Sequence, residues 1–218
     1  GDAGMVAFGH GTAYGGIDTI KEKMPTAGEE VWDDQGTGDD AGVTDVGSDA
    51  SLFYKVDMSG ITASASYART GVGTDTSVAL VASELVDGAE FGLGIATDVT
   101  ATSGTENDMT TMYAKYSTGP VTVGVQLSSI DKTAVNSDID REAAAISFAV
   151  NENLSLSWGI STVEYEATSK TDAESTGISA SYTMGGMTVG AVSNKTDSFG
   201  GTSGTDKEFT EVSLSFAF

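Results

Sequence analysis

The chain has 218 residues, with 10 Lys and Arg against 32 Asp and Glu, and a formal net charge of −22. So few basic residues argue against binding to nucleic acid or to anionic lipid headgroups, because both require Lys or Arg beside phosphates. The chain has no Cys, which excludes disulfides and thiolate ligands, and its longest apolar runs, such as 78–82, are far shorter than the roughly 20 residues of a membrane-spanning helix.

The first 47 residues differ in composition from the rest of the chain. Between positions 18 and 49 there are ten acidic residues and two basic ones, Lys21 and Lys23, which gives a local charge of 2 − 10 = −8. Residues 16–25 have the pattern of a short helix, with Asp18 as its cap and Pro25 as its end. An acidic run of this kind is most often a solvent-exposed loop.

From residue 48 to residue 218 apolar and polar residues alternate with period 2, which is typical of β-strands. In the last segment, for example, Val212, Leu214 and Phe216 share one face of a strand. The pattern predicts about eleven strands and no helix. The expected strands cover 50–58, 61–69, 76–86, 89–98, 108–118, 120–130, 139–150, 154–166, 174–184, 187–195 and 207–218. Two of them change parity, at Glu84 and Glu164, which predicts a bulge or a strand end above a membrane.

The connections between the expected strands alternate between short and long. The short ones are 59–60, 87–88, 119–120, 151–153 and 185–186, and the long ones are 70–75, 99–107, 131–138, 167–173 and 196–206. Transmembrane barrels have this rhythm, since their turns are short on one side of the membrane and their loops long on the other. A sandwich would more often mix connection lengths through Greek-key crossings. The sequence therefore predicts an antiparallel, up-and-down transmembrane β-barrel.

Five aromatic residues support a membrane setting. Each lies near a short turn or the C-terminus, on the apolar parity of its strand, so all five are expected at one height. An aromatic girdle at a membrane–water interface requires this arrangement. The five are Phe91, Tyr116, Phe148, Tyr182 and Phe216.

Both ends of the chain resemble known outer-membrane proteins. The ending Phe216-Ala217-Phe218 resembles the C-terminal signature of bacterial outer-membrane barrels, in which Phe218 would be the assembly signal, although Ser213 stands where a Gly is often found. The opening Gly1-Asp2-Ala3-Gly4, followed by the acidic segment, looks like general diffusion porins where strand five gives way to loop three. Those porins have sixteen strands and are trimeric, and their loop three folds into the barrel and forms its constriction.

This resemblance implies a chain that runs from the end of strand five through strand sixteen, with its first strands absent. Residues 1–218 would be one porin domain, with the end of a strand and a constriction-like loop in 1–47 and the strand meander in 48–218. The competing topology is a complete, substrate-specific barrel of about twelve strands that opens with 5–14. We prefer the porin topology because Gly9, Gly11, Gly15 and Gly16 make a poor opening strand.

The same resemblance assigns site residues. The inward loop would supply the acidic side of the constriction, and the lumen parity of the strands would supply a basic side made of Lys55, Lys115 and Arg141. Such charges set a field across a narrow aqueous pore. The acidic candidates are Asp18, Glu22, Glu29, Glu30, Asp33 and Asp34.

We therefore expect an outer-membrane porin of a Gram-negative bacterium that passes small hydrophilic solutes and ions with mild cation preference. The expected partners are the lipid bilayer, lipopolysaccharide and two further copies of the chain in a homotrimer. An enzyme is not expected, because one His offers no nucleophile–base constellation. No cofactor is expected, with weak Ca²⁺ binding at Asp33-Asp34 or Asp39-Asp40 as a lesser hypothesis. The rival is a secreted, acidic, β-rich adhesin or surface-layer protein.

Overall fold

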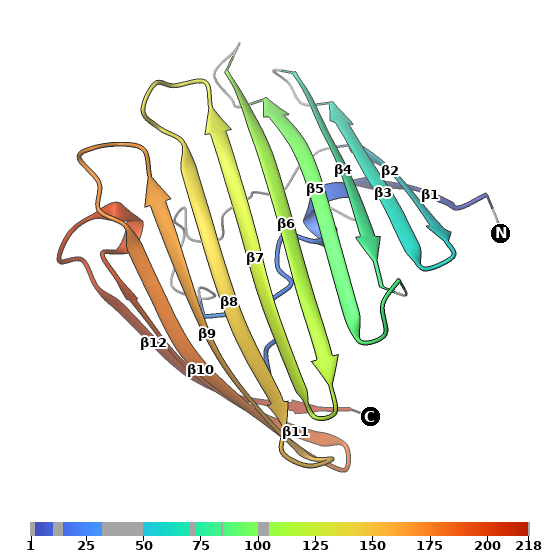
Figure 1. Ribbon diagram of the computed structural model, residues 1–218, viewed down its shortest axis with the longest axis vertical. Helices are drawn as coiled ribbons and strands as arrows, with labels where there is room; N and C mark the ends of the chain where they lie inside the picture. Colours follow the sequence, from blue (N-terminus) through green and yellow to red (C-terminus); the bar gives the residue numbers. More distant parts are fainter. Residues whose placement is uncertain are drawn as a thin grey trace. The chain divides into compact units, whose positions relative to one another are not determined.

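The computed structural model describes residues 3–10, 15–31, 50–69, 73–83, 85–99 and 105–217. Within them twelve strands form one sheet in which each strand lies beside its neighbours in the sequence (Figure 1). The strands are β1 Met5–His10, β2 Ala50–Met58, β3 Ile61–Arg69, β4 Thr74–Ala82, β5 Ala89–Val99, β6 Glu106–Thr118, β7 Val121–Lys132, β8 Ile139–Ala149, β9 Leu154–Tyr165, β10 Ala173–Met184, β11 Met187–Asp197 and β12 Lys207–Phe216. Two 3-10 helices, η1 Gly16–Thr19 and η3 Phe199–Gly201, are the described helical turns.

The all-β, antiparallel, up-and-down meander predicted from period 2 is confirmed. Short turns join β2 to β3 and β10 to β11, where Gly60 and Gly185 have positive φ angles. The register of these pairs is continuous, from Ala50–Arg69 to Met58–Ile61 and from Glu174–Asp197 to Met184–Met187. The sequence pattern sufficed here because the faces of each strand differ in polarity.

Three details correct the expectations, and a fourth decides between the two alternatives given for Glu164, a bulge or a strand end. The glycines predict no opening strand over 5–14, yet Met5–His10 forms β1, since hydrogen bonding to β2 outweighs the weak strand preference of Gly9. The expected helix over 16–25 shrinks to the four residues of η1, and Gly15 rather than Asp18 occupies its cap position. β4 ends at Ala82 instead of 86. Strand β9 pairs with β10 without a bulge, so Glu164 lies near a strand end.

The described residues belong to two compact units. The first takes its residues from Gly1–Lys23, Gly42–Ala114 and Leu127–Asp140, and the second from Met24–Ala41, Lys115–Gln126 and Arg141–Phe218. Each unit is described by itself below. The division of the chain into 1–47 and 48–218 stays a prediction.

In both units the two faces of the sheet differ in an unusual way. On one face the large apolar side chains are exposed, as are Val78 and Leu80 in the first unit and Trp158 in the second. On the other face small or polar residues such as Ser77 and Ser161 are buried, together with some large apolar ones such as Phe53. We call these the apolar face and the loop face, because residues 15–31 lie on the second. A water-soluble protein rarely exposes so many large apolar side chains on one face, so the unusual feature is the exposed apolar face.

Candidate functional site

Residues 15–20 are fixed to the loop face of the first unit through backbone donors. The N–H of Gly16 donates to Oγ of Ser64 at 3.1 Å, and the N–H of Ile17 donates to Oγ of Ser77 at 3.1 Å. Ser77 in turn shares a 2.7 Å hydrogen bond with Ser66. Because η1 has only four residues, its amide groups would otherwise lack partners. The serines of β3 and β4 therefore hold the segment against the sheet.

The close approach at this point depends on Gly16. Its φ is +64°, a conformation that other L-residues rarely adopt, and a Cβ there would lie 1.7 Å from Oγ of Ser77. The neighbouring side chains of Ile17 and Ile20 are fully buried. Two apolar side chains and two backbone hydrogen bonds thus fix η1 in one position.

Residues 24–31 are fixed in the second unit by a second pair of serines. The N–H of Ala27 donates to Oγ of Ser157 at 2.9 Å, and Ser157 shares a 2.6 Å hydrogen bond with Ser179. The hydroxyl of Thr26 lies 3.2 Å from Oγ of Ser179 and donates to the carbonyl of Glu29 at 2.7 Å. Serine hydroxyls of β9 and β10 therefore hold residues 24–31 in the same way as those of β3 and β4 hold residues 15–20.

Packing completes this second attachment. Val31 is buried, and a Cβ added to Gly159 would lie 3.0 Å from its side chain, so Val31 needs the glycine of β9 beneath it. The amide of Asn194 donates to the carbonyl of Glu30 at 3.3 Å. Between these residues and the sheet remains a cavity of about 10 Å³, the space of about one water molecule.

The acidic candidates have different environments. Glu22 is exposed, Asp18 and Glu29 are half-buried, and Glu30 is buried with 8% of its surface exposed. Oε1 of Glu30 accepts the N–H of Met24 at 2.7 Å, so this carboxylate stabilises the turn of its own segment. Asp33 and Asp34 lie outside the described residues, as does Asp39-Asp40.

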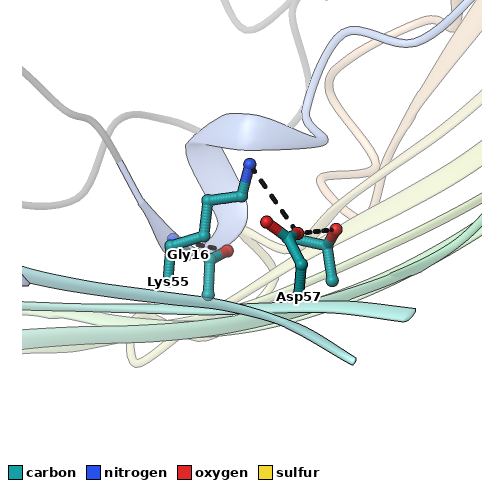
Figure 2. Close-up of polar contacts among 5 residues, drawn as sticks. Gly16, Lys55 and Asp57 are labelled. Carbon is teal, nitrogen blue, oxygen red and sulfur yellow. Dashed lines mark hydrogen bonds and ion pairs between the residues drawn. The ribbon is translucent and has the colours of Figure 1, made fainter. Parts of the chain in front are cut away.

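The basic candidates also differ in their environments. Lys55 lies on the loop face, on the same side of the sheet as η1 (Figure 2), and its register partner in β3 is Ser64. Nζ of Lys55 is 4.0 Å from Oδ1 of Asp57, an acid of its own strand, and Asp57 accepts a hydrogen bond from Thr62. Lys115 is half-buried, while Arg141 is buried with 1% exposed. Arg141 therefore packs within the second unit rather than standing open to solvent.

The five aromatic residues expected in a girdle lie on the apolar face, with 41–55% of their surfaces exposed. Each is within a few residues of a short turn, except Phe216, whose register partner Met187 directly follows such a turn. Their role as a girdle stays a prediction. Phe218 lies outside the described residues. None of the described helices has the length and apolar character needed to cross a membrane.

No group of three or more His, Cys, Asp or Glu is placed to hold a metal ion within the part of the chain that the structure describes. Both carboxylate pairs named for Ca²⁺ lie outside that part, so the hypothesis stays a prediction. Sequence reasoning missed the serines that hold the segment. A Ser in a strand shows only that its face is polar, and nothing in the sequence links Ser64 to a backbone amide 48 residues away.

Comparisons with known proteins give the family through a family model and the fold through solved structures. A family model described as Gram-negative porin matches residues 1–218. Among curated proteins nothing matches. An anion-selective porin from Comamonas acidovorans is 14% identical, with a TM-score of 0.67 over 78% of this chain and 60% of that chain. A porin structure refined at 1.8 Å is 18% identical, with a TM-score of 0.69 over 100% of this chain and 79% of that one.

A third similar structure is OmpT from Vibrio cholerae in its trimer form, 12% identical, with a TM-score of 0.68 over 96% of this chain and 76% of that one. At these identities the likeness shows the fold alone. The chain spans about three fifths of the first structures that it matches, at 60–62% of their lengths.

Proposed function

The chain belongs to the Gram-negative porin family and thus to the outer membrane, and we propose that it forms a channel for the passive diffusion of small hydrophilic solutes and ions. One observation carries the proposal. The segment 15–31 is fixed through serine hydroxyls to one face of a sheet whose opposite face exposes large apolar side chains. The loop face is then the wall of an aqueous pore and the apolar face is the surface toward lipid.

The distribution of charge on the apolar face supports this orientation. Charged residues of the described strands that share this face lie within four residues of a strand end, always beside a long connection. In β9, for instance, Leu154–Thr162 carries no charge and Glu164 follows. These nine residues cover roughly 20–23 Å along the membrane normal at a tilt near 40°, close to the ~25 Å apolar band of outer-membrane barrels.

A soluble adhesin is less compatible with this surface. Its sheet would have to cover side chains such as Trp158 and Ile178, which here are 47% and 59% exposed. In lipid the large side chains of the apolar face need no further cover. The loop face would then have to face water and the segment 15–31, because its polar groups need hydrogen-bond partners.

The preference among ions is a finer part of the proposal. The net charge of −22 and the exposed Glu22 on the inward segment favour cations in a narrow aqueous channel. The relative from Comamonas acidovorans is described as anion-selective, but a likeness of 14% identity carries only the fold. We expect the reversal potential of a KCl gradient across a planar bilayer to show mild cation preference. A clear anion preference would contradict it.

Assembly as a homotrimer with lipopolysaccharide contacts is also part of the proposal. It rests on the family resemblance and on the trimer form of the similar OmpT structure. Detergent-extracted protein should migrate in SDS gels as a large species before boiling and as a single chain after boiling. A protein that migrates as a single chain in both lanes at native concentration would count against the trimer.

The function itself is tested by reconstitution. The full-length protein should give stepwise, ohmic conductance in a planar bilayer and should make liposomes permeable to small sugars. Protein that inserts, as shown by protection from protease, but gives neither conductance nor sugar permeation would overturn the proposal.

A further inference from the structure

The connection 198–206 between β11 and β12 is folded on itself. The N–H of Phe199 donates to the carbonyl of Thr205 at 2.7 Å, and the N–H of Thr205 donates to the carbonyl of Thr202 at 3.1 Å. Nζ of Lys207 lies 3.4 Å from the centre of the Phe199 ring, where an ammonium group is attracted by the aromatic face. These contacts give the connection a defined shape of its own.

The same connection extends toward β9 and not only between its own strands. The N–H of Thr171, in the connection that follows β9, donates to the carbonyl of Gly201 at 3.0 Å. Gly201 is buried, and η3, which it ends, contacts both β9 and β10 at the end of the strands where the long connections lie (Figure 1). Since β10 lies between β9 and β11 in the sheet, the connection reaches across β10.

Tyr165 shows which face of the sheet the connection covers. It is the last residue of β9 and has the parity of Ser161 and Val163, which are buried on the loop face. A Cβ added to Gly201 would lie 2.9 Å from Cδ2 of Tyr165 and 2.8 Å from Cδ of Lys170. Nζ of Lys170 lies 4.1 Å from the centre of the Tyr165 ring. The connection therefore packs against the loop face, with its backbone at Gly201 directly on the ring.

We propose that the connection 198–206 narrows the mouth of the channel at this end and limits the size of the solutes that enter. The inference rests on the proposed channel function, in which the loop face lines water, and it adds a second narrowing besides the segment 15–31. Residues 202–205 of the connection are exposed and uncharged, so they restrict passage by size and not by charge. Passage then depends on the packing of Gly201, and the preference among ions does not.

Two glycines of the connection give a matched pair of variants. Gly201 and Gly204 have φ angles of +73° and +75°, so an Ala at either position carries a similar backbone strain. An added methyl group would meet the Tyr165 ring at Gly201, whereas nothing lies within 4 Å of one at Gly204. Gly201→Ala should therefore release the connection from β9, and Gly204→Ala should leave it in place.

The variants are compared in the full chain, in planar bilayers and in liposomes. Relative to Gly204→Ala, Gly201→Ala should show a larger single-channel conductance and a higher ratio of raffinose to glucose permeation. The reversal potential of a KCl gradient should be unchanged. Tyr165→Ala, which removes the ring beneath the connection, should act in the same direction and gives a second variant in case Gly201→Ala does not fold.

Protease cleavage of the connection in detergent-solubilised protein is measured in parallel, because it does not depend on conduction. Faster cleavage of Gly201→Ala and Tyr165→Ala than of Gly204→Ala, together with the larger conductance, supports the inference. Equal cleavage, or faster cleavage with unchanged conductance and sugar permeation, overturns it and leaves the channel function standing. A changed reversal potential would contradict restriction by size alone. Wild-type protein that inserts without conducting refutes the channel function itself, and the inference with it.

Discussion

At the scale of single residues, the serine hydroxyls of the loop face do more than line a polar wall. Ser64 and Ser77 receive backbone amides of η1, and Ser157 receives the amide of Ala27. A hydroxyl can do this because it accepts a hydrogen bond while donating its own proton to a neighbour, as Ser77 can with Ser66. At each of these three serines the segment 15–31 is held by a hydrogen bond between a backbone amide and a hydroxyl, not by an ion pair.

The first prediction concerns Ser157. Its replacement, Ser157→Ala, removes the acceptor of the Ala27 amide and the partner of Ser179, and should lower the free energy of unfolding in detergent by about 1–2 kcal/mol. Denaturant titration measures this change, and open-channel current noise should rise because the segment is held less firmly. Ser155→Ala, on the same face of β9 nearer the turn, is the control. Equal effects of the two substitutions would refute the attachment.

The second prediction concerns Gly16. Gly16→Ala adds a methyl group that meets Oγ of Ser77 at a φ of +64°, so we expect η1 to shift and the strain to cost about 1–3 kcal/mol. Limited proteolysis should cut the segment faster in this variant. Gly28→Ala provides the comparison, because its added methyl group would lie no closer than 3.4 Å to any neighbour. Similar cleavage rates in both variants would contradict the proposed role of Gly16.

At the scale of elements, the strands could be predicted from the sequence and their attachments could not. Period 2 is a local signal, and it located eleven strands with ends mostly within two or three residues. β1 was not predicted, because Gly9 lowers the strand preference of this stretch. Its formation depends on pairing with β2, about 45 residues away. The hydroxyl contacts and the burial of Glu30 and Arg141 depend on tertiary structure, which a single-sequence pattern does not encode.

The third prediction tests the apolar face of one strand. Ile178 lies in the middle of β10 with 59% of its surface exposed. Ile178→Lys should destabilise the folded protein in lipid vesicles by about 2–4 kcal/mol, the cost of Lys near the midplane of the bilayer. Glu174→Lys, on the same face at the strand end, should cost no more than about 1 kcal/mol. If the two substitutions cost the same in lipid, β10 does not cross the membrane as proposed.

At the scale of the whole molecule, the charged residues are distributed unequally between the two faces of the sheet. In the described strands the apolar face carries charge only beside the long connections, where the charged side chains would lie at the level of the polar headgroups. On the loop face of the first unit, Lys23 and Lys55 are among the described residues that line one hollow beside η1. One chain of net charge −22 thereby offers a neutral surface to lipid and a charged one to water.

In the proposed orientation the loop face lines water and the apolar face contacts lipid. The chain has no Cys, so single cysteines introduced one at a time give an unambiguous readout with a charged, membrane-impermeant thiol reagent. In reconstituted bilayers Glu22→Cys and Lys55→Cys should react rapidly and change the conductance. Leu156→Cys and Ile178→Cys should remain unmodified because lipid covers them. Rapid modification of Leu156→Cys and Ile178→Cys, with Glu22→Cys protected, would contradict this orientation.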